Sequence, residues 1–219
     1  MKNKPKKIAY RIGDAFKIGG KELPTTAPGW VRNFTEQTLF HYKDTIAAEY
    51  LIRTKKFKDH ELLKKIISEF KIKKNVHIPS QNEWVVHIRT GDVIDKAIQD
   101  VDDFCKEYIR VDGKGLAPVR YVSPLSTFRK KIEKAKNKNI TNVTICSAFH
   151  LSNNNEKSEL YLSRVFDLFK DFNLTKRINK FTPDEDFIYM CNSKYFTYTN
   201  GGFSHIAKSQ VQMNNGILL

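Results

Sequence analysis

The sequence has little cysteine and no long hydrophobic run. Among 219 residues it contains three cysteines, which are widely spaced and form no Cys-x-x-Cys pair. They exclude a disulfide-stapled scaffold and a zinc ribbon, and they fit a reducing compartment. No stretch approaches the roughly 18 consecutive apolar residues that a membrane span needs. The basic start MKNKPKK is not followed by the apolar segment of a secretory signal, so we expect a cytoplasmic protein without a membrane span.

Acidic residues are outnumbered, since 38 Lys+Arg stand against 24 Asp+Glu and leave a formal net charge of +14. This balance favours polyanionic partners such as nucleic acid, lipid headgroups or a phosphorylated substrate. Many lysines, however, fall on the polar faces of predicted helices, and most aromatic residues fall at core-periodic positions. Nucleic-acid binding is therefore the weakest hypothesis. The chain is 40% hydrophobic, which excludes global disorder, and its length allows one large domain or two small ones.

Residues 1–80 predict a short, mainly helical region. A strand candidate at 8–10 precedes a long loop that glycines and prolines punctuate as far as Gly29. Helices are expected over 35–53, from the spacing of apolar residues, and over 59–70, where Asp59 can cap the first turn. Pro79 breaks the pattern, and we place a domain boundary there, between 1–80 and 81–219.

From Trp84 onward, short strands alternate with helices. Strands are expected at 84–88, 142–147, 177–179, 195–199 and 217–219. Helices are expected from Ser123 or Pro124, over 157–172, from Pro183 and from Phe203, and an irregular stretch around 100–103. This alternation predicts an α/β fold, with a Rossmann-like parallel sheet and flanking helices over residues 81–219. Parallel sheets bind ligands at the carboxyl ends of their strands, which directs attention to the residues after each strand.

The first of these strands runs into His87-Ile88-Arg89-Thr90-Gly91-Asp92. An arginine at a strand end can bind phosphate through two parallel hydrogen bonds. Gly91 permits a tight turn, and Asp92 can hold the loop or the arginine. An ordinary strand exit with a surface arginine explains the pattern equally well.

A second candidate site follows the strand at 195–199, where Gly201, Gly202, Phe203 and Ser204 precede a predicted helix. Close backbone N–H groups, a hydroxyl and a helix N-terminus together suit a phosphate. A turn followed by Ser204 as helix N-cap is the alternative.

Two Asp-x-Asp pairs, Asp100/Asp102 and Asp184/Asp186, have the form that holds a divalent metal in some sugar-nucleotide transferases. Such pairs arise by chance in charged chains, and acids after Pro183 are normal at a helix start. We expect no metal site.

The sequence HIRTGD resembles the H-x-R-x-G-D motif of the fucosyltransferase superfamily, and DEDFIYMCNSKYFTYTNGGFSHIA resembles that superfamily's acidic–aromatic helix, short strand and Phe-Ser loop. Their order across residues 84–207 fits the nucleotide-sugar-binding domain of these GT-B-type enzymes. The resemblance implies a metal-independent, inverting transferase without a cofactor, which uses GDP-fucose as donor and a glycan or protein hydroxyl as acceptor. Residues 1–80 would then form a short acceptor-side or degenerate region.

The resemblance also implies roles for individual residues. Arg89 would contact the β-phosphate and stabilise the leaving GDP, His87 would line the nucleotide pocket, and Asp186 would accept from guanine N–H groups. The loop from Gly201 to Ser204 would hold the phosphates. Arg89 and Asp92 are the catalytic candidates.

The general base stays open. Asp92, Asp95 and Asp14 are candidates, and His150 follows a predicted strand. Residues 10–14 repeat the R-x-G-D form, which is either chance or a second arginine loop. The hypotheses are a fucosyltransferase-like enzyme of glycan biosynthesis, a non-catalytic nucleotide- or glycan-binding relative and, last, a nucleic-acid-binding module.

Overall fold

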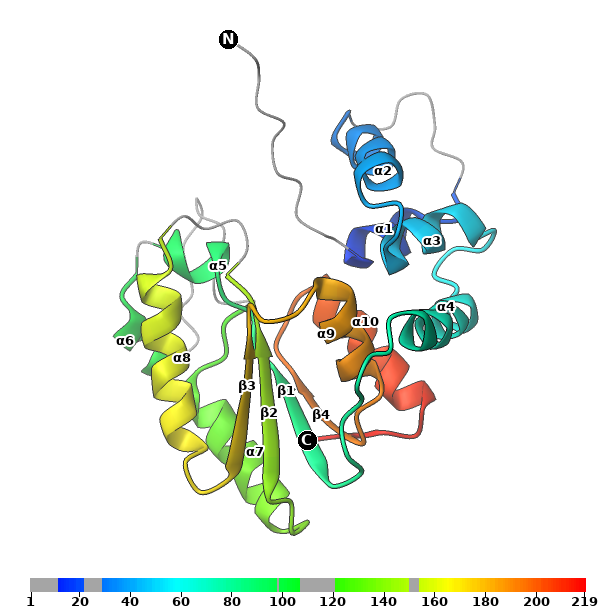
Figure 1. The fold of residues 1–219 in the computed structure, drawn as a ribbon. Coiled ribbons are helices and arrows are strands. Elements are labelled where there is room, and N and C mark those ends of the chain that lie inside the picture. Colours follow the sequence, from blue (N-terminus) through cyan, green and yellow to red (C-terminus); the bar gives the residue numbers. More distant parts are fainter. Residues whose placement is uncertain (1–11, 22–28, 98, 107–120, 150–153) are drawn as a thin grey trace. The chain divides into compact units, whose positions relative to one another are not determined.

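The computed structural model describes residues 12–21, 29–97, 99–106, 121–149 and 154–219. The chain divides into two compact units, residues 1–76 and 77–219. Within its described residues, the first unit consists of α1 (Ile12–Ile18), α2 (Gly29–His41), α3 (Ile46–Arg53) and α4 (His60–Lys73), which Figure 1 labels. Asp59 caps α4 as expected, because its Oδ1 accepts from the N–H of Leu62 at 3.0 Å.

Two expectations for this unit are wrong. The loop expected before Gly29 begins with helix α1, because Ile12, Ala15 and Phe16 recur at helical spacing and are buried together. The single helix expected over 35–53 is two helices, α2 and α3. Thr45 separates them, because its hydroxyl accepts from the N–H of Ala48 at 3.3 Å and so begins a new helix. The strand candidate at 8–10 lies outside the described residues.

The second unit is built on a five-stranded parallel sheet in the order β3-β2-β1-β4-β5. The strands are β1 (Glu83–His87), β2 (Asn142–Ser147), β3 (Asn173–Ile178), β4 (Tyr195–Tyr198) and β5 (Ile217–Leu218). In the middle of the sheet, His87 pairs with Cys146 on one side and with Tyr198 on the other. The predicted α/β fold with a Rossmann-like parallel sheet is confirmed.

Helices cover both faces of this sheet. They are α5 (Asp92–Asp95), α6 (Val101–Lys106), α7 (Leu125–Lys136), α8 (Glu156–Leu168), α9 (Pro183–Cys191) and α10 (Gly202–Met213). Figure 1 shows α7 and α8 on one face and α9 and α10 on the other. The stretch expected to be irregular around 100–103 contributes to α6, because Val101 and Phe104 turn inward and are buried.

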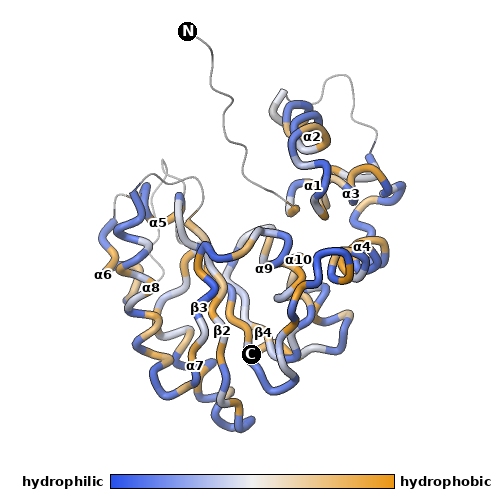
Figure 2. The backbone as a smooth tube through the Cα atoms, viewed as in Figure 1, coloured by the Kyte–Doolittle hydropathy of each residue, from blue (hydrophilic) through white to orange (hydrophobic). Residues whose placement is uncertain are grey.

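The main core lies between β1, β2 and the α7–α8 layer. Trp84, Val86 and Ile88 alternate toward this side, and Phe128 of α7 and Val165 of α8 meet them. The period of two in the strand and the helical period in the covering helices thus bury the same layer. Figure 2 shows hydrophobic residues along the middle of the sheet, while hydrophobic and hydrophilic residues alternate along α7 and α8.

The strand order places a topological switch point between β1 and β4. From β1 the chain moves outward to β2 and β3, with α7 and α8 on one face. It then returns to β4, on the other side of β1, through α9 on the opposite face. Right-handed crossovers require this change of face when the direction reverses. The loops after β1 and β4 therefore leave toward opposite faces, and open α/β sheets bind ligands at such a point.

Candidate functional site

The two motifs singled out in the sequence lie side by side at this switch point. The N–H of Thr199, just after β4, donates to the carbonyl of His87 at 3.2 Å. The N–H of Arg89 donates in turn to the Thr199 hydroxyl at 2.8 Å. These bonds continue the β1–β4 pairing beyond the last strand residues. The loop with Arg89 and the loop with Gly201 are therefore held together where their strands end.

The guanidinium of Arg89 forms an ion pair with Asp92. Its Nη2 donates to Asp92 Oδ1 at 2.7 Å, and the side chains are 25% and 26% exposed. Within the described part of the chain, no group accepts a hydrogen bond from its buried Nε. A guanidinium carries five N–H donors, so Arg89 keeps donor capacity beyond Asp92. Positive charge and this remaining donor capacity therefore lie at the carboxyl edge of β1.

The first turn of α10 lies beside this arginine loop. Gly201 is the N-cap residue, with φ +129° and ψ 152°, and it provides no side-chain cap. The alternative that Ser204 is the N-cap is therefore wrong. Ser204 is buried, and its hydroxyl lies 2.6 Å from Nδ1 of His87. A phosphate at this terminus would consequently meet backbone N–H groups of the Gly201–Gly202 segment.

Aromatic rings join the site to α9. The ring of Phe203 lies 5.5 Å from the ring of His87 and 5.4 Å from the ring of Phe187. His87, at the end of β1, is thus packed and hydrogen-bonded by the α10 segment. The structure brings His87, Arg89 and Asp92 together with the residues of the glycine-containing loop.

Asp186, the expected guanine acceptor, has another partner. Its Oδ1 accepts from Nε of Arg177 at 3.0 Å, and both side chains are almost wholly buried. The Arg177 guanidinium also stacks on the rings of Phe181 and Tyr189, at 3.5 and 4.1 Å. Burial raises the pKa of Asp186 to about 6, against the opposing effect of Arg177.

The other acidic candidates are also engaged. Asp95 accepts two hydrogen bonds from Ser158, and Asp14 lies in α1 of the first unit. Asp102 pairs with Arg164, and Asp184 is buried. His150 lies outside the described residues, as does the arginine of the second R-x-G-D segment. In the described ranges, no group of three or more His, Cys, Asp or Glu side chains could hold a metal ion.

Sequence reasoning missed the residues that fix the arginine loop. Thr199 accepts from Arg89, the hydroxyls of Thr90 and Ser147 lie 2.7 Å apart, and Ser158 accepts from Gly91 at 2.9 Å. Ser147 ends β2 and Thr90 lies three residues after the end of β1, so the strand-end rule could have identified them. Nothing in the sequence marks Ser158, which lies inside a helix.

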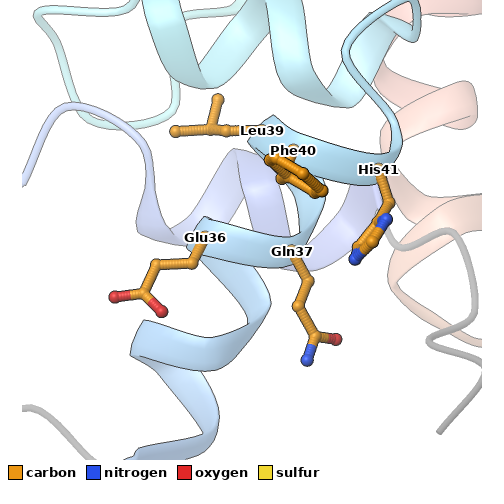
Figure 3. A pocket seen from close by; sticks show the side chains of 5 residues that line it. All are labelled: Glu36, Gln37, Leu39, Phe40 and His41. Atoms are coloured by element: carbon orange, nitrogen blue, oxygen red, sulfur yellow. The ribbon is translucent and has the colours of Figure 1, made fainter. Parts of the chain in front are cut away.

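A pocket in the first unit lies on the surface of α2 and is shown in Figure 3. Its lining residues are Glu36, Gln37, Leu39, Phe40 and His41. All five belong to α2, and Phe40 is 77% exposed. None is a residue that the sequence marked for binding or catalysis.

Among the helices of the described residues, none is both long and apolar enough to cross a membrane. Comparison of the sequence with protein-family models gives no match, and comparison with curated proteins gives none either.

Proposed function

We propose that the second unit binds the diphosphate of a nucleotide sugar between the Arg89 loop and the N-terminus of α10. The observation that carries this proposal is the hydrogen bond from Arg89 to Thr199, 2.8 Å long, which joins the two loops at the switch point. An arginine with spare donors and a helix terminus with a glycine N-cap both offer positive potential to the same region.

The proposed reaction is transfer of the sugar, with fucose from GDP-fucose as the expected donor. The acceptor hydroxyl oxygen forms a bond to the anomeric carbon, and the bond from that carbon to the β-phosphate oxygen breaks with inversion. GDP leaves as an anion that Arg89 stabilises, because preorganised positive charge lowers the energy of a developing anion. The hydroxyl proton passes to a base, for which Asp92 is the nearest candidate to Arg89.

Three details belong to the same proposal. A GT-B-type enzyme would place its acceptor, a glycan or a protein, on a second domain, and residues 1–76 are the part of this chain outside the sheet unit. Arg89 and the α10 terminus take the place of a metal at the diphosphate. Asp186 would receive guanine donors through Oδ2, since Oδ1 accepts from Arg177.

Thermal unfolding with GDP, UDP, CMP, ADP and GDP-fucose, each with and without EDTA, tests the proposal. A ligand that binds only the folded state stabilises it by about 2.7 kcal/mol at a hundredfold excess over Kd. We expect a GDP-selective shift that survives EDTA and is much smaller in Arg89→Ala. A shift selective for UDP that needs a metal, or no shift with any nucleotide, would contradict the proposal.

Turnover separates an enzyme from a binding protein at the same site. Release of free GDP from GDP-fucose in the presence of glycan or protein acceptors is expected for the wild type and not for Arg89→Ala. If the protein binds GDP but releases no GDP from GDP-fucose with any acceptor, the non-catalytic alternative holds.

A further inference from the structure

The loop that carries Arg89 is hydrogen-bonded to a serine of α8. The N–H of Gly91 donates to Oγ of Ser158 at 2.9 Å, across 67 positions of sequence. Ser158 has no exposed surface. Gly91 has φ +78°, a backbone conformation that favours glycine, so its N–H direction depends on this unusual turn.

Asp95 fixes the orientation of that serine. Its Oδ1 accepts from the backbone N–H of Ser158 at 2.9 Å, and its Oδ2 accepts from the Ser158 hydroxyl at 2.8 Å. A hydroxyl can donate one hydrogen bond, and the Ser158 hydroxyl donates it to Asp95. The oxygen of Ser158 is therefore left to accept from Gly91, so the direction of every bond in the chain Gly91–Ser158–Asp95 is determined.

The same glycine separates the arginine from its carboxylate partner. Arg89 precedes Gly91 by two positions, and Asp92, which accepts from Arg89, follows it as the first residue of α5. Any shift of Gly91 moves the backbone of both members of the ion pair. A displacement of about 1 Å is enough to weaken a bidentate contact or a catalytic geometry severely.

We infer that Ser158, oriented by Asp95, is a positioning residue that sets Arg89 for the phosphate groups of the ligand. This inference rests on the proposed function and extends it to residues on α5 and α8. Ser158 does not touch the ligand; it acts through Gly91. Asp95, a candidate general base by sequence, thereby has a positioning role.

The Ser158→Ala variant isolates the hydroxyl. The backbone N–H at position 158 can still donate to Asp95, so the first turn of α8 keeps its acceptor, while the link to Gly91 is lost. Ser193→Ala is the matched control. Ser193 is also buried, and it lies just past the C-terminal end of α9. Its hydroxyl donates to the carbonyl of Met190 at 2.8 Å.

The measurements are the Kd of GDP by calorimetry and the urea midpoint of unfolding. We expect both serine variants to lower the midpoint, Ser158→Ala by more because its hydroxyl makes two hydrogen bonds and that of Ser193 makes one. Only Ser158→Ala should weaken GDP binding, about tenfold, which corresponds to about 1.4 kcal/mol. In an Arg89→Ala background, Ser158→Ala should have no further effect on Kd, because the contact that it positions is gone.

The outcomes separate the two proposals. If wild type does not bind GDP, or if Arg89→Ala binds it normally, the proposed function fails and this inference fails with it. If Arg89 matters but Ser158→Ala binds like wild type, or weakens binding equally in both backgrounds, only the positioning role is overturned. Should Ser158→Ala not fold, Asp95→Asn replaces it, with the exposed Asp103→Asn as control, and the same Kd comparison decides.

Discussion

The hydroxyl of Ser204 lies 2.6 Å from Nδ1 of His87, which ties the first turn of α10 to the end of β1. Both side chains are buried, and they come from positions 117 residues apart. The bond fixes where the positive end of α10 stands relative to the arginine loop. Four predictions concern this arrangement and the buried acid beside it.

Ser204→Ala should lower the free energy of unfolding by about 1–2 kcal/mol, because the buried hydrogen bond between the Ser204 hydroxyl and Nδ1 of His87 is lost. Urea denaturation measures this. Ser209→Ala is the control on the same helix, since Ser209 is half-buried and its hydroxyl donates to the carbonyl of His205, one turn back in the same helix. Equal losses in the two variants would show that the His87 contact contributes nothing.

Thr199→Val should weaken GDP binding, because the N–H of Arg89 loses its acceptor while the side-chain volume is kept. The expected change in Kd is about tenfold, measured by calorimetry. Thr199→Ser keeps the hydroxyl and should restore binding. A valine variant with wild-type affinity would remove Thr199 from the site.

Gly201→Ala should cost about 1–3 kcal/mol of stability and weaken GDP binding. The cause is backbone strain at φ +129°, because among the described residues an added Cβ would meet just the Tyr121 ring, at an ordinary 3.8 Å. Gly29→Ala is the control: that position begins α2 in open space, and stability should stay the same or rise. Urea unfolding and calorimetry give the two readouts. A Gly201→Ala variant with wild-type stability would contradict the claim that the backbone at position 201 requires glycine.

The stability of the protein should depend on pH through Asp186, whose pKa burial raises to about 6. The unfolded chain has an ordinary aspartate pKa of about 3.9, so the folded state binds the proton more tightly. The contribution of Asp186 is therefore complete below about pH 4 and is lost as the pH rises through about 6. Between these two pH values, the free energy of unfolding should fall by about 1.4 kcal/mol for each pH increment of one.

Urea unfolding of wild type and Asp186→Asn across this range measures the effect. Wild type should gain stability relative to the asparagine variant as the pH falls. The exposed Asp167→Asn serves as control. A difference that runs the other way would mean that the charge of Arg177 outweighs burial.

Local patterns predicted the sheet unit well and the helical unit less well. The strand over 142–147 was expected at its observed bounds, because a short apolar run with β-branched residues is typical of a strand buried in a parallel sheet. The break at Thr45 and the helix at Ile12–Ile18 were not expected. Glycines near α1 indicated a loop, and tertiary burial of Ile12 and Phe16 overrode that local preference.

By itself, the sequence determined which chemical groups follow the strands: an arginine with a glycine turn after one, and two glycines with a serine after another. Strand alternation and the carboxyl-end rule depend on local spacing, so these positions could be expected without coordinates. Tertiary structure alone decided that β1 and β4 are neighbours, that Ser204 bonds His87, that Asp186 pairs with Arg177 and that Ser158 holds Gly91. Except for Arg177 and Asp186, which lie nine positions apart on β3 and α9, each is a contact between segments distant in the chain. The packing of the whole sheet decides such contacts.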